Sequence, residues 1–172
     1  ASKLDSVRNI PGFPKAEDSD IISLSDPPHY TACPNPFLED FIKENSTPYD
    51  PKKDQYQKGP FAFDVSAAKK DPIYNMHSYH TKVPPKTIVP FILHYTNPGD
   101  LIYDGFCGTG MTGVAAQNCN NPELELKKDI EKKFPNTQWG ERKTILCDLS
   151  PIATSIAYNL NNPVDSEEFE KE

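Results

Sequence analysis

Three glycines near the middle of the chain have a spacing that suits nucleotide binding. Gly108, Gly110 and Gly113 form the pattern Gly-x-Gly-x-x-Gly, which lets a backbone turn tightly and approach a nucleotide while the next helix packs on its strand. The apolar run 101–103 and the acid Asp104 precede them. The pattern is a weak signal by itself, so the surrounding residues decide which ligand this glycine loop serves.

Two further acids follow apolar runs elsewhere in the chain. Asp148 ends the run 144–147, the next predicted strand after the glycine loop. An acid at that strand end binds the ribose hydroxyls of dinucleotides, so the spacing allows any adenosine-containing ligand. Asp26 follows the run 21–25 and precedes two prolines, which cannot donate to a sheet ladder. We therefore expect Asp26 at the carboxyl end of a strand, where open α/β sheets place their ligands.

The tripeptide Asp26-Pro27-Pro28 favours S-adenosylmethionine over a nicotinamide dinucleotide. A nicotinamide enzyme has no evident use for it, and the sequence shows no hydride-transfer partner. We expect no metal, because His77 and His80 have no carboxylate or cysteine at a convincing spacing and no two cysteines form a C-x-x-C pair. The four cysteines are Cys33, Cys107, Cys119 and Cys147.

The order of apolar runs and breakers predicts an α/β fold built from parallel βαβ units. Strands are expected over 21–25, 101–103 and 144–148, with Asp26, the glycine loop and Asp148 at one sheet edge. Three strands make a small sheet for this class, so we expect an incomplete parallel sheet. Helices are expected over 35–45, from 85 to 95, after the glycine loop, over 121–134 with Asn121 as its cap, and over 150–160.

The chain is expected to hold one main domain. An irregular arm covers 1–20, the domain covers 21–160 with a long loop over 46–77, and an acidic tail or the start of a following segment covers 161–172. The loop could contact nucleic acid through interleaved lysines and aromatics, but a solvated loop anchored by a few aromatics is the favoured interpretation. The residues concerned are Lys52, Lys53, Tyr56, Lys58, Phe61, Phe63, Lys69 and Lys70.

Composition limits the function classes. The 172 residues include no apolar stretch near the ~20 residues of a membrane span. With 18 Lys+Arg against 25 Asp+Glu, the net charge of −7 has the wrong sign for a domain that grips nucleic acid alone, so any such affinity must come from a local patch or from parts of a longer chain. No secretory signal is evident, so we expect reduced thiols and a cytoplasmic location.

Four segments together resemble a known family. Residues 98–113 read P-G-D-L-I-Y-D-G-F-C-G-T-G-M-T-G and are similar to P-G-D-x-V-x-D-P-F-x-G-S-G-T-T-G, the S-adenosylmethionine motif of the amino DNA methyltransferases. Residues 79–84 resemble the H-P-T-Q-K-P segment of the permuted members. Residues 26–29 resemble the D-P-P-Y catalytic tetrapeptide of the same members, and residues 145–151 resemble their ribose-binding strand end. The catalytic motif precedes the cofactor motif, which is the order of the beta-type permutation.

The resemblance implies a Rossmann-like methyltransferase fold and transfer of a methyl group from S-adenosylmethionine to adenine N6 or cytosine N4 in DNA. The Asp26 carboxylate and the Pro27 carbonyl would accept hydrogen bonds from the target amine, and the base would be flipped out of the duplex. The departure D-P-P-H leaves open whether His29 or Tyr30 stacks on the base. The implied catalytic residues are Asp26, Pro27, Pro28, His29 and Tyr30.

The resemblance also implies a set of cofactor-binding residues. Phe106 would lie near the cofactor, Asp148 would bind the ribose hydroxyls, and Thr81 and Lys82 could reach the methionine carboxylate. Gly105 stands where the family has proline, which loosens the turn. The implied set is Thr81, Lys82, Asp104, Gly105, Phe106, Cys107, Gly108, Thr109, Gly110, Thr112, Asp148, Leu149 and Ser150.

The short distance between the catalytic and cofactor motifs departs from the family. Positions 31–76 leave no room for the remaining strands and the target-recognition domain that permuted members hold there. The chain is therefore expected to be an N-terminal portion of a larger methyltransferase that would supply further DNA contacts. Two other functions stay open: a methyltransferase of the same fold acting on RNA or a protein amide, and a non-catalytic cofactor-binding module.

Overall fold

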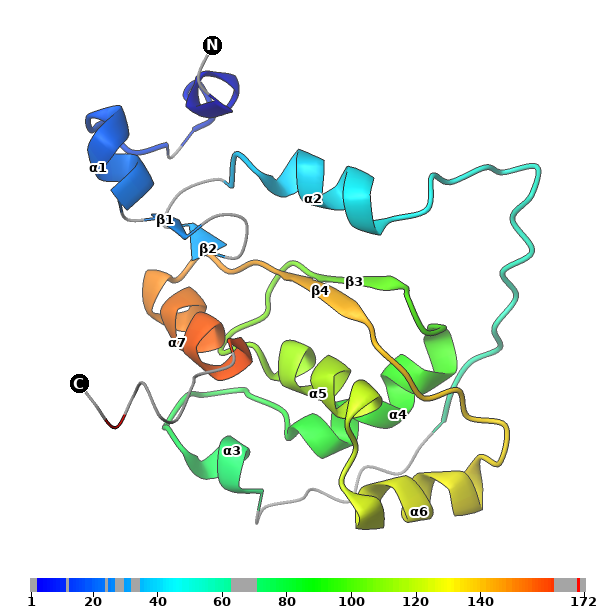
Figure 1. Cartoon of the computed structure of the whole chain (residues 1–172). Coiled ribbons are helices and arrows are strands. Elements are labelled where there is room, and N and C mark those ends of the chain that lie inside the picture. The colour runs from blue at the N-terminus through cyan, green and yellow to red at the C-terminus, as the bar shows by residue number, and fades with distance from the viewer. Residues whose placement is uncertain are drawn as a thin grey trace. The chain divides into compact units, whose positions relative to one another are not determined.

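The computed structural model describes residues 3–11, 13–23, 25–26, 30–31, 35–62, 71–162 and 170. The chain forms two compact units, residues 1–50 and residues 51–172. The first unit contains the 3-10 helix η1 (Lys3–Ser6), helix α1 (Asp18–Ser23), strands β1 (Ser25–Asp26) and β2 (Tyr30–Thr31), and helix α2 (Leu38–Asn45) (Figure 1). The two short strands pair antiparallel, with Ser25 opposite Thr31 and Asp26 opposite Tyr30.

The strand predicted over 21–25 is wrong over most of its length. Ile21 lies in α1 and is buried, and Asp18 and Asp20 occupy the first turn, where negative charge stabilises a helix. A short apolar run fits a buried helix face as well as a strand, so its pattern could not separate the two. Within the described residues β1 pairs with β2 and not with a parallel strand, so the predicted third parallel strand is also wrong.

The helix predicted over 35–45 is confirmed, although it begins later. The Asn35 carboxamide accepts a hydrogen bond from the Phe37 backbone N–H at 2.9 Å, and the helical residues start at Leu38. This contact is an Asx turn just before the helix, whose N-cap residue is Phe37 and which has no side-chain cap. On the exposed side Lys43 pairs with Glu39 one turn earlier, a contact that contributes little because water screens it.

The second unit contains one parallel βαβ arrangement. Strands β3 (Leu101–Asp104) and β4 (Lys143–Leu146) pair parallel, with Leu101 opposite Lys143 and Asp104 opposite Leu146. The predicted parallel pairing of these two segments is therefore confirmed. The helices of this unit are α3 (Pro72–Asn75), α4 (Pro85–Tyr95), α5 (Met111–Asn120), α6 (Leu124–Lys133) and α7 (Pro151–Asn161) (Figure 1).

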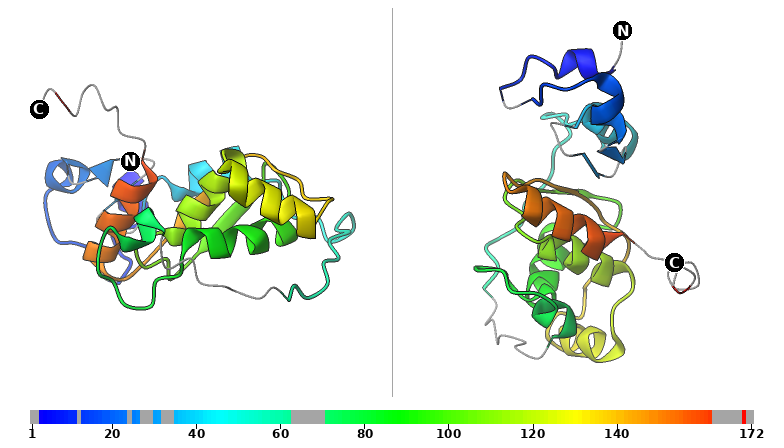
Figure 2. Two further views of the ribbon diagram at one scale, coloured as in Figure 1. Left: turned by 90° about the horizontal axis from the view of Figure 1, so that it is seen from below. Right: turned by 90° about the vertical axis from the view of Figure 1, so that its left-hand side faces the viewer.

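Helix α5 is the centre of this unit. It contacts α4, β4 and α7, as Figures 1 and 2 show. Its small residue Ala115 and its Cys119 are completely buried against Val89 of α4, and Ile130 of α6 joins the same cluster. Small side chains let helix backbones approach closely, and each fully buried residue of valine size contributes about 1.5–3 kcal/mol. The glycine loop therefore leads directly into a helix that is largely buried.

The sequence predicts the start of α7 correctly and the start of α6 wrongly. Ser150 caps α7, where its hydroxyl accepts from the Ala153 N–H at 3.4 Å, and this confirms the helix predicted over 150–160. The predicted cap at Asn121 is wrong, because Asn121 ends α5 and α6 begins at Leu124 after Glu123. Proline at 122 follows the end of α5 and cannot continue that helix.

A buried arginine holds the entry to β4 against the end of α4. Arg142 donates to the hydroxyl and the carbonyl of Thr96, and to the carbonyls of Gln138 and Gly140, at 2.8–3.1 Å. Burial lowers the pKa of this guanidinium. Because neutral oxygens satisfy its donors, the residue can remain inside the fold and connect segments that are far apart in sequence.

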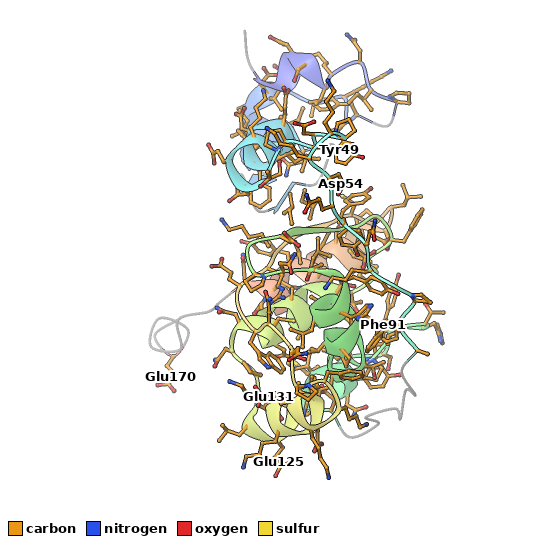
Figure 3. The ribbon with its side chains drawn as sticks, turned by 90° about the vertical axis from the view of Figure 1, so that its right-hand side faces the viewer. Tyr49, Asp54, Phe91, Glu125, Glu131 and Glu170 are labelled. Carbon is orange, nitrogen blue, oxygen red and sulfur yellow. The ribbon has the colours of Figure 1, made fainter. Side chains whose placement is uncertain are left out.

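Residues 51–62, which belong to the long loop predicted over 46–77, are tied to α4. Residues 72–75 of the predicted loop form helix α3. The Tyr56 hydroxyl donates to the Tyr95 carbonyl at 3.1 Å, and the Phe61 N–H donates to the Tyr95 hydroxyl at 2.9 Å. The Phe61 ring stacks on His94 and meets Phe91 edge-on, and Figure 3 shows Phe91 on the side of α4 where the loop passes. Tyr56 and Phe61 therefore anchor this loop, as predicted for a solvated loop held by a few aromatic residues. Phe63, Lys69 and Lys70 lie outside the described residues.

No helix in the part of the chain that the structure describes is long and apolar enough to cross a bilayer.

Candidate functional site

The carboxyl ends of β3 and β4 bring the glycine loop beside residues 147–150. Past the strands, the Cys147 N–H donates to the Asp104 carbonyl and the Cys107 N–H donates to the Cys147 carbonyl, both at 2.9 Å. The backbone pairing thus continues beyond the regular ladder. Two segments that the sequence places far apart meet at one sheet edge, as predicted for the glycine loop and Asp148.

Asp104 closes the turn that follows β3. One carboxylate oxygen accepts from the Phe106 N–H at 3.1 Å, and the other accepts from the Thr112 hydroxyl at 2.6 Å. Hydrogen bonds to an ionised acceptor are among the stronger ones in proteins. Asp104 therefore joins the strand end to the first turn of α5 and holds the loop between them.

Asp148 connects the two halves of the site. Its Oδ2 accepts from the Gly108 N–H at 2.9 Å, and its Oδ1 accepts from the Ser150 N–H at 2.9 Å. Each carboxylate oxygen has two lone pairs, so both oxygens keep acceptor capacity after these bonds. Asp148 can hold the glycine loop and still receive hydroxyl groups of a ligand.

Close packing explains why two of the three motif positions are occupied by glycine. Gly110 has a φ of +78°, and a Cβ there would lie 2.8 Å from the Ala157 Cβ. A Cβ on Gly113 would lie 2.8 Å from the Leu146 Cδ1. Side chains at these positions would therefore push α5 away from α7 and β4, which is the close helix–strand packing that the motif predicts.

A buried hydroxyl beside the N-terminus of α5 has no partner. The Thr109 side chain is 1% exposed, and its Oγ1 makes no hydrogen bond within the described residues. Buried polar groups in native proteins nearly always have partners, so an orphaned one points to a missing ligand or water. The first turn of a helix also presents N–H groups that favour negative charge. This end of the site therefore suits an anionic or strongly polar group.

Large apolar side chains are exposed next to the two carboxylates. Phe106 is 87% exposed and Leu149 is 94% exposed, and both follow directly after the paired strand ends. Ile152, in the first turn of α7, is also largely exposed. Apolar side chains beside fixed polar groups are typical of small-molecule sites, where they contact the flat part of a ligand while the polar groups orient it.

Cys107 should not act as a nucleophile. Burial above all, and then the negative charges of Asp104 and Asp148, raise the pKa of its thiol to about 12. Because the thiolate is the reactive form, iodoacetamide at pH 8.5 should modify Cys107 at least about 10²-fold more slowly in the native chain than in urea-unfolded chain, as mass spectrometry can measure. Equal rates in the two states would contradict this burial.

The same raised pKa makes the free energy of unfolding depend on pH. The unfolded thiol titrates near 9.0 and the folded one near 12. The stabilisation from keeping Cys107 protonated in the fold is therefore complete below pH about 9 and is lost as the pH rises toward 12. Burial also raises the pKa of Cys147, on the neighbouring strand end.

The segment before α4 supplies a residue that motif reasoning did not assign. The Tyr79 ring lies 3.3 Å from the position of a Cβ on Gly108, whose φ is +52°. Tyr79 therefore covers one side of the glycine loop. Its place at the start of the segment similar to H-P-T-Q-K-P was the signal that could have identified it.

Thr81 and Lys82 have their described contacts within their own segment. Thr81 adopts a φ of +68°, unusual for a residue with a side chain, and its hydroxyl bonds the His80 carbonyl. The Lys82 ammonium donates to the His77 carbonyl and lies 4.6 Å from the centre of the Tyr74 ring. Burial first, and the Lys82 charge second, lower the pKa of His77. A contact of these residues with a cofactor stays a prediction.

A buried acid anchors this segment to the rest of the unit. Asp71 is 5% exposed, and its side chain accepts from the Tyr74 N–H at 3.0 Å at the start of α3. The Lys86 ammonium lies 3.9 Å from the Asp71 carboxylate and 2.8 Å from that of Glu123. This three-residue bridge ties the segment that carries Tyr79 to the starts of α4 and α6.

The predicted catalytic residues belong to the first unit. Asp26 and Tyr30 lie in β1 and β2, where their backbones pair directly. Pro27, Pro28 and His29 lie outside the described residues. The catalytic roles of these five residues stay predictions. Among the residues that the structure describes, no group of three or more His, Cys, Asp or Glu side chains could hold a metal ion.

One of three comparisons with known proteins identifies a family. The model of a family described as DNA methylase, of the N6/N4 methyltransferase type, matches residues 9–159. The matched region includes β1 and β2, which carry the predicted catalytic residues Asp26 and Tyr30, the glycine loop and Asp148. No curated protein and no solved structure gives a significant match.

Proposed function

The chain belongs to the DNA methylase family of adenine-N6 and cytosine-N4 methyltransferases, and we propose that it transfers a methyl group from S-adenosylmethionine to the exocyclic amine of adenine or cytosine in DNA. The observation that supports the proposal most directly is the hydrogen bond from the Gly108 N–H to Asp148. It joins the glycine loop to the next strand end, where the resemblance expects a ribose-binding acid.

The residues at this edge fit the proposed cofactor. Phe106 and Leu149 offer exposed apolar surface for the adenine, and Asp148 retains acceptor capacity for the ribose hydroxyls. The unpartnered Thr109 hydroxyl and the N-terminus of α5 suit the methionine carboxylate. When bound, S-adenosylmethionine supplies a methyl group on a positively charged sulfur, which is open to attack by a nucleophile.

The chemistry then depends on the target amine. Its lone pair is delocalised into the base, so it is a poor nucleophile. The Asp26 carboxylate and the Pro27 carbonyl would accept its two N–H bonds and localise the lone pair toward the methyl group. His29 or Tyr30 would stack on the flipped base. The reaction would be a direct displacement, in which the amine nitrogen bonds the methyl carbon while the carbon–sulfur bond breaks and S-adenosylhomocysteine leaves. The proton that the amine loses would pass to the Asp26 carboxylate and on to solvent. Positioning and electrostatics would supply the catalysis, without a covalent enzyme intermediate.

Replacing Asp26 with alanine should separate catalysis from cofactor binding. We expect methyl transfer to DNA by the full-length protein to fall at least about 10²-fold, because one acceptor for the reacting amine is lost. The affinity for S-adenosylhomocysteine, measured by calorimetry, should stay within about 2-fold, because the Asp26 carboxylate is assigned to the base and not to the cofactor. Transfer of a radiolabelled methyl group provides the activity measurement.

The matched control is Asp20→Ala, on an exposed turn of α1. Its activity should equal that of the wild type. The assay includes duplex DNA, RNA and a glutamine-containing peptide as separate acceptors. Wild-type activity that survives Asp26→Ala would support the non-catalytic module, and methylation of RNA or peptide in place of DNA would assign a different substrate to the same site.

A further inference from the structure

We propose that Asn161, the last residue of α7, positions the glycine loop for cofactor binding; this inference rests on the proposed function. The Asn161 Nδ2 donates to the Gly110 carbonyl at 3.1 Å and to the Ala157 carbonyl at 2.8 Å. The second acceptor belongs to its own helix, whereas the first is in the loop 51 residues earlier. A side chain outside the motif thus holds the motif's central glycine.

A second side chain sets the orientation of the Asn161 carboxamide. The Gln117 Nε2 donates to the Asn161 Oδ1 at 3.2 Å and to its backbone carbonyl at 3.0 Å. With Oδ1 serving as acceptor for Gln117, Nδ2 is left to donate to Gly110. The three residues form a connected network that runs from α5 through the end of α7 to the loop that precedes α5.

The hydrogen bond to the Gly110 carbonyl also sets the direction of the backbone N–H that follows it. In a planar trans peptide the carbonyl and the following N–H point in opposite directions. Holding the Gly110 carbonyl toward Asn161 therefore fixes the Met111 N–H, the first of α5, to point away from α7. The same carbonyl also accepts from the Gly113 and Val114 N–H groups at 3.0 and 3.3 Å. Asn161 stabilises the peptide at which the loop becomes a helix.

The surrounding packing is built around this contact. A Cβ on Gly110 would lie 2.7 Å from the Asn161 Nδ2, and a Cβ on Gly113 would collide with its carboxamide. The absence of side chains at two motif positions is therefore what lets Asn161 reach the backbone. Because glycine has no Cβ, it can adopt many backbone conformations besides the positive φ observed at Gly110, so an external restraint has most to contribute here.

The chain offers matched controls for a test. Asn159 lies on the same helix and is exposed, and its Nδ2 donates only one turn back, to the Ser155 carbonyl at 2.7 Å. Ala153 is completely buried in α7 but lies a full two turns before Asn161. Asn159→Ala removes an asparagine without touching the loop, and Ala153→Gly weakens the helix without removing the bond to Gly110.

The first measurement is the affinity for S-adenosylhomocysteine by calorimetry on the full-length protein, at a temperature where all variants are folded. We expect Asn161→Ala to raise Kd about 3- to 10-fold, the size of one hydrogen bond. Asn161→Asp should lose at least as much, because it keeps the shape and the acceptor for Gln117 but lacks the donor to Gly110. Asn159→Ala and Ala153→Gly should stay within about 2-fold.

The second measurement needs no ligand. Hydrogen exchange of the amides in residues 110–114 should become faster in Asn161→Ala but not in Asn159→Ala. If the wild type fails to bind while this exchange difference is present, the proposed function fails and the positioning role stands. Wild-type affinity in Asn161→Asp, an equal loss in Ala153→Gly, or unchanged exchange in Asn161→Ala would each overturn the positioning role.

Discussion

Replacing Gly110 with alanine should lower the free energy of unfolding by about 3 kcal/mol or more. The φ of +78° costs a residue with a Cβ roughly 1–2 kcal/mol. The added methyl would also lie 2.8 Å from the Ala157 Cβ and 3.0 Å from the Ala157 Cα, and overpacking of this kind costs about 1–3 kcal/mol. Urea unfolding, followed by the fluorescence of the single tryptophan, Trp139, measures the change.

Gly99 provides the control that separates backbone strain from the steric clash. Its φ is +92°, but a Cβ there would meet nothing within 4 Å. Gly99→Ala should therefore show the strain alone, roughly 1–2 kcal/mol. If Gly110→Ala were no more destabilising than Gly99→Ala, α7 would not pack against the glycine loop as described.

Asp148→Asn should weaken the binding of S-adenosylhomocysteine about 10²-fold. The change is isosteric, but the amide nitrogen would face either the Gly108 or the Ser150 N–H, where an oxygen now accepts. A hydrogen bond to a charged group contributes about 1.5–3 kcal/mol, and 1.4 kcal/mol corresponds to a factor of ten. Both the loop geometry and the proposed acceptor for the ribose hydroxyls are affected, so calorimetry should detect the loss directly.

The control for this variant is Asp129→Asn, on an exposed position of α6. It makes the same change in charge and should leave Kd as in the wild type. Thermal unfolding of Asp148→Asn distinguishes two roles. A lower melting temperature with unchanged affinity would show that Asp148 only organises the turn before α7, whereas loss of affinity supports the assignment to the cofactor.

Local signals in the sequence were sufficient where neighbouring residues decide the conformation. The apolar runs that became β3 and β4, the glycines between β3 and α5, and the Ser150-Pro151 start of α7 are short-range patterns with few alternatives. The family follows from the same motifs, and the match to residues 9–159 confirms it. For the same reason the meeting of the glycine loop with Asp148 could be predicted, because parallel strands share one carboxyl edge.

Predictions failed where local patterns were ambiguous. Ile21 and Ile22 suit a strand or a helix, and the acids of the first turn together with burial of Ile21 favour α1. Asparagine is suited to the end of a helix as well as to its start. Helix α5 extends to Asn120, and Asn121 is its C-cap residue. In the first case the burial of Ile21 and in the second case the length of α5 decided between alternatives that the local pattern left open.

The amino-acid sequence by itself determined the residue types of this protein's site: glycines where the backbone must turn, acids at strand ends, and the family to which they belong. Only the tertiary structure decided which distant side chains hold them. Tyr79 against Gly108 and Asn161 on the Gly110 carbonyl are contacts between segments with no shared local pattern. Such contacts depend on how α5 and α7 pack, and that packing is set by the fit of many side chains at once.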